Sequence, residues 1–398
     1  MFPTKSTYPI NILCGLIGTI FLCSCQSSIQ KKLKEQVIAN IKQVTIQKAA
    51  SFLTSRPITV TASICKRSSG GKHDFYSEGD YWWPDPKNPN GPYIRKDGQS
   101  NPNNFSDHRL AMIRLNDIVA TLTSAWLLNH KPEYLDKIKE HLNAWFIDTT
   151  TMMSPNMSYA QAVWGRYTGR GIGIIDAYHL VEVAQSVKIL TDRGAIRGKE
   201  ASAIKNWFAQ FLNWMTTTSY GINEMNAKNN HGTCWAVTAS MFARLTGNQA
   251  VIDLCKERFK HILLPTQMAK NGSFPLELIR TKPYGYSLFN MDAMANLAEI
   301  LSTPKDNLWN YVSPGGKSLK KGMEFIYPYI RNKTSWPYKQ DIYIWKQWPV
   351  RQSSLLFAGL AYTNASYIAT YLKLPDNPTH PEVIRNLPVR HPLIWLLN

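Results

Sequence analysis

The chain has 398 residues, which is enough to bury a sizeable core in one large domain or two smaller ones. Lys and Arg outnumber Asp and Glu by 45 to 27, so the formal net charge is +18. This excess indicates a polyanionic partner: nucleic acid, anionic lipid or an acidic polysaccharide. The basic residues are scattered along the chain, which favours a charged groove over a nucleic-acid arm, with a merely solvated basic surface as the alternative.

Residues 1–24 have the pattern of an export signal. Lys5 precedes an apolar run from Ile10 to Leu22, which is too short for a membrane-spanning helix and typical of a signal peptide. The run ends Leu-Cys-Ser-Cys25, a lipobox pattern that predicts cleavage before Cys25 and lipidation of that cysteine as a lipid anchor. An ordinary secretory signal is the alternative. Either way we expect export.

The lipobox predicts an outer-membrane lipoprotein on the periplasmic or cell-surface side, held to the membrane only through its lipid. Residues 25–30 are expected to be a short tether, and residues 31–398 a single domain, which we expect to be monomeric. Cys65, Cys234 and Cys255 then remain, and none has Cys-x-x-Cys or zinc-ligand spacing. Cys234 and Cys255 are predicted to be buried thiols, with a disulfide between them as the alternative. We expect no metal and no cofactor.

The chain begins with a predicted helix at 31–53, which leads into a long irregular region at 54–105. This region is rich in Gly, Pro, Asn and aromatic residues, and a long loop in a compact domain is usually functional or disordered; its many aromatics argue against disorder. Trp82 or Trp83 can stack on a sugar ring, and Trp83 is the candidate we select. Packing at the end of a helical barrel is the alternative.

From Ser106 the apolar spacing predicts helical hairpins that recur about every sixty residues. Stacked hairpins tend to curve, although composition alone does not separate a closed ring from an open solenoid or a bundle. A weakly alternating stretch at 336–350 predicts a hairpin or a cover near the groove. The expected helices are 106–128, 132–145, 171–191, 200–215, 232–245, 249–263, 288–301, 317–330 and 354–372.

Two stretches about fifty residues apart carry the chemistry. The first contains Asn229, Asn230 and His231 just before a predicted helix, where free backbone N–H groups can hold an anion. The second contains Arg280, a fixed positive fork, and Tyr286, a phenol that can carry a proton. Together these groups suit gripping a carboxylate and removing the proton beside it.

That reaction is β-elimination on a uronic acid sugar. Donors that neutralise the carboxylate stabilise the enolate-like intermediate, a base takes the C5 proton, and an acid protonates the departing O4. In mannuronate and glucuronate the proton and O4 lie on the same side of the ring, so one tyrosine can serve both steps. In guluronate they lie on opposite sides, and His231 can then be the base opposite Tyr286.

These residues resemble the alginate lyase superfamily, most closely polysaccharide lyase family 38, whose members cleave alginate or glucuronan. The resemblance rests on Asn-Asn-His231, on Glu-Leu-Ile-Arg280 with a following tyrosine, and on two supporting stretches at 79–86 and 159–176. It implies an all-α fold, an alpha/alpha toroid that is an incomplete barrel of helical hairpins with a groove at one end. It also implies that Asn230, His231 and Arg280 neutralise the carboxylate and that Tyr286 is the acid or acid/base, with Tyr284 as an alternative.

Further candidates for substrate binding lie near these stretches. Tyr159, Gln161, Arg166 and Arg170 can bind hydroxyls and carboxylates of neighbouring sugars. Alternatively, the two arginines can pair with Asp176 or cap a carbonyl end. Glu224 can orient His231 by accepting its second N–H, or can be a surface carboxylate. Asn229 can be a turn former alone, and Arg280 can instead form a buried salt bridge with Glu277 or Asp292.

The sequence therefore predicts a polysaccharide lyase acting on an acidic polysaccharide, alginate in preference to glucuronan, with no nucleic-acid partner. A glycoside hydrolase on the same scaffold is a second hypothesis, for which Glu224 and Glu277 are the only carboxylates in the candidate turns. A non-catalytic glycan-binding lipoprotein is a third.

Overall fold

The computed structural model describes residues 13–397, and the side chains of residues 27–397. The first twelve residues of the predicted signal peptide and the side chain of Cys25 therefore lie outside what is described. Among the described residues, no helix combines the length and the apolar character that crossing a membrane requires.

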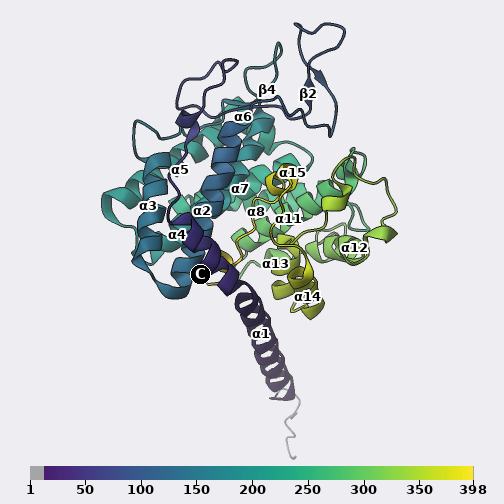
Figure 1. The fold of residues 1–398 in the computed structure, drawn as a ribbon. Helices are drawn as coiled ribbons and strands as arrows, with labels where there is room; N and C mark the ends of the chain where they lie inside the picture. The colour runs from purple at the N-terminus through teal and green to yellow at the C-terminus, as the bar shows by residue number, and fades with distance from the viewer. Residues whose placement is uncertain (1–12, 398) are drawn as a thin grey trace, which may run out of the picture.

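The centre of the molecule is an arc of helices, each packed against the next. These inner helices contact one another in chain order, and α7 and α11 are buried over nearly their whole length (Figure 1). A helix that is apolar on all sides belongs in the interior of a large core. The inner helices are α2 (Asp107–Asn129), α4 (Val181–Asp192), α7 (Asn230–Thr246), α11 (Pro283–Leu301) and α13 (Ser353–Ala361).

A second set of helices packs against this arc from outside. On α12, residues Leu319, Met323, Ile326 and Ile330 are buried at spacings of three and four, which is the stripe expected of a helix with one covered face. Inner and outer helices together form the alpha/alpha toroid that the resemblance implied. The outer helices are α3 (Pro132–Phe146), α5 (Gly198–Thr217), α8 (Gln249–Arg258), α12 (Leu319–Arg331) and α14 (Ala365–Lys373).

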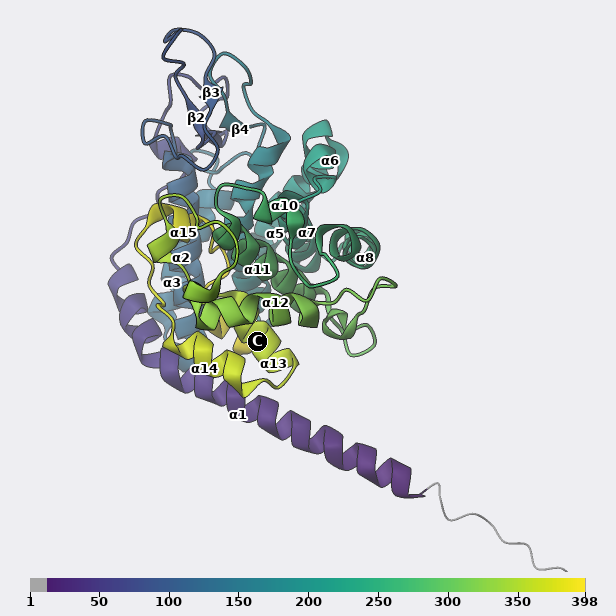
Figure 2. The same ribbon diagram turned by 90° about the vertical axis from the view of Figure 1, so that its right-hand side faces the viewer.

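Helix α1 (Leu13–Phe52) joins the two ends of the arc. It packs against α2 on one side and against α13 and α14 on the other, with Leu33, Val37 and Ile41 buried (Figure 2). Residues 25–30, expected to be a tether, are helical and continuous with α1. The predicted helix at 31–53 is present, and its contacts bring the start of the folded chain to its end.

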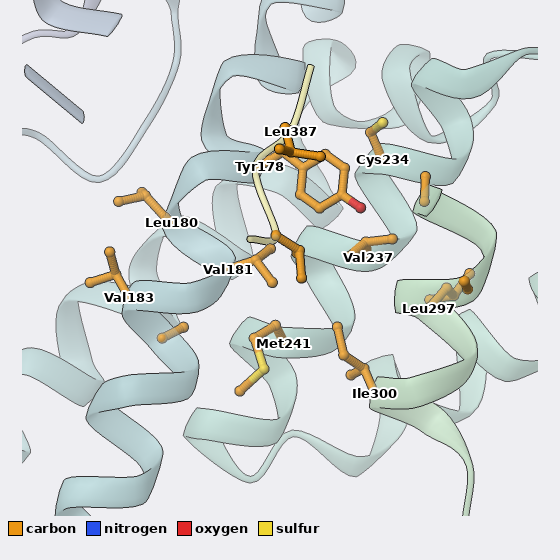
Figure 3. Close-up of a cluster of buried hydrophobic side chains, with 14 of the residues drawn as sticks. Tyr178, Leu180, Val181, Val183, Cys234, Val237, Met241, Leu297, Ile300 and Leu387 are labelled. Atoms are coloured by element: carbon orange, nitrogen blue, oxygen red, sulfur yellow. The ribbon is translucent and has the colours of Figure 1, made fainter. Parts of the chain in front are cut away.

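One continuous hydrophobic core runs through the layers, from Leu33 to Leu396. Figure 3 shows its centre, where Tyr178 and Val181 meet Val237 from α7 and Leu297 and Ile300 from α11. Cys234 and Cys255 are buried free thiols, as expected, and no disulfide joins them. This packed interior fixes the helix ends that carry the polar residues described below.

The strands are few and short. Strand β1 (Tyr76–Glu78) pairs in parallel with β4 (Tyr159–Ala162), and β2 (Trp82–Trp83) pairs antiparallel with β3 (Ile94–Arg95). They lie with their loops over one end of the helical body, at the top of Figure 1. The long region 54–105, expected to be irregular, therefore contains three of these strands.

Three expectations about secondary structure were wrong in detail. Residues 336–350 contain no strand, and Trp345–Gln347 is a short 3-10 helix. The predicted helix 354–372 is two helices, α13 and α14, because Thr363 adopts a left-handed φ of 50° between them. The predicted helix 171–191 starts as a 3-10 helix, Gly171–Leu180, before α4. Two helices begin early, α1 at Leu13 and α11 at Pro283, and α8 ends at Arg258 and continues to Leu263 as a π-helix. The other helices begin and end within a few residues of their predicted bounds.

Candidate active site

A cavity of about 310 Å³ opens at the end of the body where α7 and α11 begin. Its wall includes the segment of β2, the end of β4, the 3-10 helix before α4, and α15 (Pro381–Arg385). Five residues predicted from the two main stretches line it together: Asn229, Asn230, His231, Arg280 and Tyr286. The two stretches that are fifty residues apart in the sequence therefore meet at one cavity.

The anion at the start of α7 is the side chain of Glu277. Its carboxylate accepts hydrogen bonds from the backbone N–H of Asn230 and from the Asn230 side-chain amide, each at 2.8 Å. Backbone N–H groups at a helix start attract negative charge, so this position is already occupied by the protein itself. The second N–H of the Asn230 amide remains for a ligand, and its direction is fixed by Glu277.

His231 is held by Glu224 from behind. Its Nδ1 lies 2.6 Å from the Glu224 carboxylate, which is buried, while the imidazole is partly exposed at the cavity. Burial lowers the pKa of His231, but the charge of Glu224 and its hydrogen bond outweigh burial, so the net pKa is raised. The imidazole is therefore biased towards its charged form, with Nε2–H directed away from Glu224.

Arg280 is anchored by Asp97 from the segment after β3. Two Arg280 nitrogens, Nε and Nη2, donate to Asp97 at 3.2 and 2.9 Å, and Thr281 donates to the same carboxylate at 2.9 Å. Burial raises the pKa of Asp97, but the bond with Arg280 outweighs it and lowers the pKa to about 2. The salt bridges considered from the sequence, to Glu277 or Asp292, are not formed among the described residues.

Tyr286 lies in the first turn of α11, beside Arg280 and Tyr81. Its hydroxyl is 2.7 Å from the hydroxyl of Tyr81 and 3.4 Å from Arg280 Nη2, and the guanidinium carbon lies 4.5 Å from the phenol ring centroid. Burial and then the neighbouring Tyr81 raise the pKa of Tyr286 well above its usual value. The resting form is therefore the neutral phenol, which can donate a proton.

The hydroxyl of Tyr81 continues the chain of polar groups. It donates to Glu382 at 3.1 Å, and Glu382 is bound by Lys282 Nζ at 2.5 Å. Arg385 also donates to the Tyr81 hydroxyl, at 3.2 Å. A proton therefore has a continuous path of hydrogen bonds from Tyr286 to a buried carboxylate.

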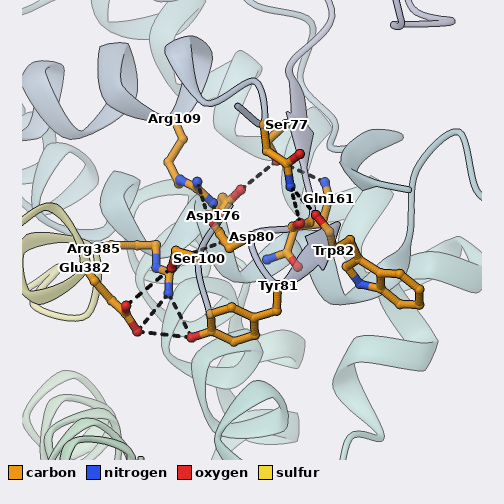
Figure 4. A network of polar contacts seen from close by, with 12 residues as sticks. Ser77, Asp80, Tyr81, Trp82, Ser100, Arg109, Gln161, Asp176, Glu382 and Arg385 are labelled. Carbon is orange, nitrogen blue, oxygen red and sulfur yellow. Dashed lines mark hydrogen bonds and ion pairs between the residues drawn. The ribbon is translucent and has the colours of Figure 1, made fainter. Parts of the chain in front are cut away.

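A charged network forms the floor of the cavity (Figure 4). Asp80 is held between Arg109, at 2.6 Å, and Arg385, at 2.5 Å. Asp176 lies 3.5 Å from Arg109 and accepts from Ser77 at 2.9 Å. Asp80 is thus neutralised by two arginines, whereas at Asp176 burial outweighs the charge of Arg109 and raises the pKa of the carboxyl group. Arg170 does not pair with Asp176, as one alternative proposed.

The other predicted binding residues divide into two groups. Gln161 and Arg170 line the cavity, and Glu224 lies behind His231. Four residues do not line it: Tyr159, Arg166, Trp83 and Tyr284. Tyr284 is fully buried, and its hydroxyl donates to the carbonyl of Tyr329. Side chains two residues apart on a helix point to different sides, so Tyr284 points away from the cavity that Tyr286 lines.

Trp82, and not Trp83, faces the cavity. Neighbouring residues of a strand point to opposite faces, and the Trp83 indole instead donates to the carbonyl of Gln99 at 2.8 Å. Sequence reasoning also missed several charged or polar lining residues. These missed residues are Asp80, Tyr81, Arg95, Arg385 and Asn386. The dense aromatic and acidic run 79–86 was a signal for Asp80 and Tyr81, but nothing in the sequence marked Arg385 and Asn386 near the end of the chain.

The chain matches known proteins over most of its length. The family model described as alginate lyase matches residues 59–336. The chain is similar to an alginate lyase from Bacteroides ovatus of known crystal structure, with 32% identity, a TM-score of 0.79, and coverage of 93% of this chain and 97% of that one. A comparison with curated proteins found no match.

Two more distant crystal structures share the fold. Alginate lyase A1-III from Sphingomonas species A1 is 14% identical, with a TM-score of 0.52 and coverage of 83% of this chain and 89% of that one. A variant of alginate lyase A1-III in complex with a tetrasaccharide is 13% identical, with a TM-score of 0.54 and coverage of 82% and 88%. Because the family model covers most of the chain, the chain belongs to the alginate lyase family and is a polysaccharide lyase.

Proposed function

We propose that this enzyme cleaves a polyuronate, alginate in preference to glucuronan, by β-elimination in the cavity between α7 and α11. The observation that carries the proposal is the meeting of Asn230, His231 and Arg280 with Tyr286 around one cavity. The family supports the reaction class, and the tetrasaccharide complex of alginate lyase A1-III supports an oligosaccharide as the ligand.

The carboxylate of the sugar binds against three donors. Asn230 offers its free amide N–H, His231 offers Nε2–H, and Arg280 offers nitrogens that Asp97 does not occupy. Charge develops on this carboxylate as the C5 proton leaves, and donors held rigidly by buried or half-buried carboxylates stabilise it without reorganising. Glu277, Glu224 and Asp97 each fix one donor, which is the arrangement that such stabilisation requires.

His231 acts as a neutralising donor in this account. The Glu224 carboxylate raises the pKa of His231 and so favours the charged imidazole, which cannot accept a proton. A base role on guluronate would require His231 to lose its proton first. We therefore assign proton transfer on mannuronate to Tyr286 alone.

Tyr286 transfers the proton in both directions. As a phenolate it takes the C5 proton, and as the resulting phenol it gives a proton to the departing O4 on the same side of the ring. The phenolate can form because the Tyr286 proton can pass to Tyr81 and on to Glu382, while Arg280 stabilises the negative oxygen. The hydrogen-bonded pair of phenols is therefore part of the proposed mechanism.

The glycoside hydrolase alternative has less support from the geometry. It needs two carboxylates flanking the scissile bond, one of them free to attack or to activate water. Glu277 is bound to Asn230 and Glu224 is bound to His231, so both carboxylates face protein donors. The lining carboxylates Asp80 and Asp176 are held by arginines.

The test is turnover on pure polymannuronate, polyguluronate and glucuronan, followed by the ultraviolet absorbance of the unsaturated product. The proposal expects a rise with at least one polymer, and the fastest rise with polymannuronate. Sugar products without a double bond would instead support a hydrolase. Binding without turnover would support the glycan-binding lipoprotein.

We also propose export and anchoring through Cys25, on the strength of the lipobox. Mass spectrometry of the mature protein from its host membrane would detect Cys25 as the first residue, with a lipid attached to its sulfur. A soluble mature chain with an unmodified start would contradict the anchor.

A further inference from the structure

Beyond the catalytic cavity, a tight turn presents two large aromatic side chains to solvent. Trp164 is 45% exposed and Tyr167 is 54% exposed. The turn is rigid, because Val163 and Tyr167 exchange two backbone hydrogen bonds of 2.8 and 2.9 Å and Gly165 takes a left-handed φ of 70°. A rigid turn that holds aromatic rings in water suggests a surface used for contact.

Two guanidinium groups lie beside these rings. Arg166 and Arg170 have their guanidinium carbons 5.7 and 5.6 Å from the centroid of Trp82, and Arg170 is 6.0 Å from that of Tyr167. Arg166 is held in place by donating from Nε to the carbonyl of Tyr93 at 2.8 Å. Arg170 donates from Nε to the carbonyl of Gln161 at 2.8 Å. In both cases a backbone carbonyl accepts the hydrogen bond from Nε, so the two Nη nitrogens remain available to bind a ligand.

Neither arginine has an acidic partner among the described residues. Arg170 is partly buried, and burial, followed by the charge of Arg95, lowers its pKa to about 10. A desolvated guanidinium without a carboxylate is costly, and a bound anion would relieve the cost. The two arginines are therefore fixed, positively charged and unneutralised.

These side chains connect two cavities. Trp82 and Arg170 line the catalytic cavity, and Arg166 and Tyr167 line a neighbouring cavity of about 300 Å³. Because Arg170 contacts Tyr167, aromatic rings and guanidinium groups follow one another without a break from the first cavity to the second. A sugar chain has apolar ring faces and, in a polyuronate, one carboxylate on every unit, so it presents the matching sequence of groups.

We propose that Trp82, Arg166, Tyr167 and Arg170 form a ledge that binds uronate units of the polymer outside the catalytic cavity. The rings stack on sugar faces, and the arginine forks bind carboxylates. The proposal rests on the proposed function for the identity of the ligand. It assigns the ledge to distal units, so its contribution depends on chain length.

The experiment compares Tyr167→Ala and Arg166→Ala with the parent enzyme over mannuronate oligomers, from the shortest that is cleaved to the polymer. Loss of one stacking ring or one charged hydrogen-bonding fork is expected to lower kcat/KM on the polymer about tenfold. The loss should shrink as the chain shortens and fall below about twofold on the shortest substrate. Added salt should reduce the effect of Arg166→Ala, because screening weakens its charge.

Arg331→Ala is the matched control. Like Arg166, Arg331 is an exposed arginine whose guanidinium lies over an aromatic ring, 5.9 Å from the ring centroid of Tyr327, but it lies on α12 and lines neither cavity. It should leave kcat/KM unchanged on every chain length. If the ledge variants lost the same factor in kcat/KM on every chain length, the proposal would be overturned, because the residues would then act by supporting the catalytic cavity.

A binding measurement separates failure of the ledge from failure of the proposed function. Electrophoresis through a gel containing alginate should retard the parent protein, and Arg166→Ala should migrate faster than both the parent and Arg331→Ala. If the parent cleaves no polyuronate but shows this pattern, the ledge stands and the reaction is wrong. If cleavage is observed and the variants are retarded like the parent, the ledge is wrong.

Discussion

The hydroxyl groups of Tyr286 and Tyr81 lie 2.7 Å apart, although the residues are 205 positions apart in the sequence. The Tyr81 hydroxyl in turn donates a hydrogen bond to Glu382, so the Tyr286 phenol at the cavity is linked to a buried carboxylate. The pair matters because a single tyrosine that is both base and acid must first lose its own proton. The structure supplies a neighbouring group that can take it.

Tyr81→Phe should therefore slow catalysis while leaving the cavity intact. We expect kcat to fall about 10- to 100-fold, within the usual range for a group that assists proton transfer. KM should change little, because the variant removes one hydroxyl and no carboxylate donor. Steady-state kinetics on polymannuronate measure both quantities.

Tyr362→Phe provides the control for this change. Tyr362 is also partly buried, and its hydroxyl donates to the carbonyl of Trp309 at 2.9 Å, away from the cavity. If kcat of Tyr81→Phe equalled that of the parent, or if kcat fell equally in Tyr81→Phe and Tyr362→Phe, the proposed proton path would be contradicted.

The donor roles predict a shift in pH dependence for Glu224→Gln. Glu224 raises the pKa of His231, so the imidazolium persists to higher pH in the parent than it would without that carboxylate. If His231 must be charged, activity falls as pH rises through its pKa, and Glu224→Gln should move this alkaline fall to lower pH. The profile of kcat/KM against pH measures the shift. If His231 were the base, activity would instead rise through that pKa.

Asn230→Ala should reduce both activity and stability. Loss of one donor to the developing charge is expected to lower kcat about 100-fold, the usual scale for such a group. The buried Glu277 carboxylate would also lose its bond from the amide, which costs about 1–3 kcal/mol of unfolding free energy. Kinetics and thermal denaturation check the two effects separately. A variant that is destabilised but fully active would show that Asn230 serves only to hold Glu277.

Asp292 makes the stability of the fold depend on pH. Burial raises the pKa of Asp292 to about 7, while an unfolded aspartate titrates near its ordinary value of about 4. Between these two pKa values the native state holds a proton that the unfolded state has lost. The contribution of Asp292 to the free energy of unfolding is therefore fully present below about pH 4 and is lost as pH rises through about 7. Asp292→Asn removes the titration, so its Tm should exceed that of the parent by several degrees more at pH 8 than at pH 4.5.

Asp136→Asn is the matched control for this prediction. Asp136 is also helical but is exposed to solvent on α3. Its substitution should change Tm equally at both pH values. A pH-independent effect of Asp292→Asn would contradict the raised pKa.

Much of the fold follows from local patterns that the sequence displays directly. The apolar spacing of 132–145 predicted α3, and Pro132 marked its first turn. The break between α13 and α14 was missed, although Asn364 marks the start of α14, where its side chain accepts hydrogen bonds from the backbone N–H groups of Ser366 and Tyr367. Residues 336–350 alternate weakly, yet Trp336 packs against Tyr284 and Tyr329, so tertiary packing overrode the strand pattern.

The candidate site could be predicted only where its residues cluster in the sequence. Asn230 and His231 are adjacent, and Arg280 and Tyr286 are six positions apart, so their chemistry could be recognised together. The partners that fix them are remote: Asp97 lies 183 residues from Arg280. Such pairings depend on how the toroid closes, and no local pattern contains that information.

The central claim is that Tyr286 carries out the proton transfers of β-elimination at this cavity. A comparison of Tyr286→Phe with Tyr284→Phe tests this claim most directly. Both remove one buried phenol oxygen from the first turn of α11, but only Tyr286 lines the cavity. In single-turnover reactions with polymannuronate, followed by ultraviolet absorbance of the unsaturated product, Tyr286→Phe should lose at least about 100-fold in rate and Tyr284→Phe should resemble the parent. The reverse order, or product formation by Tyr286→Phe at the parent rate, would contradict the account.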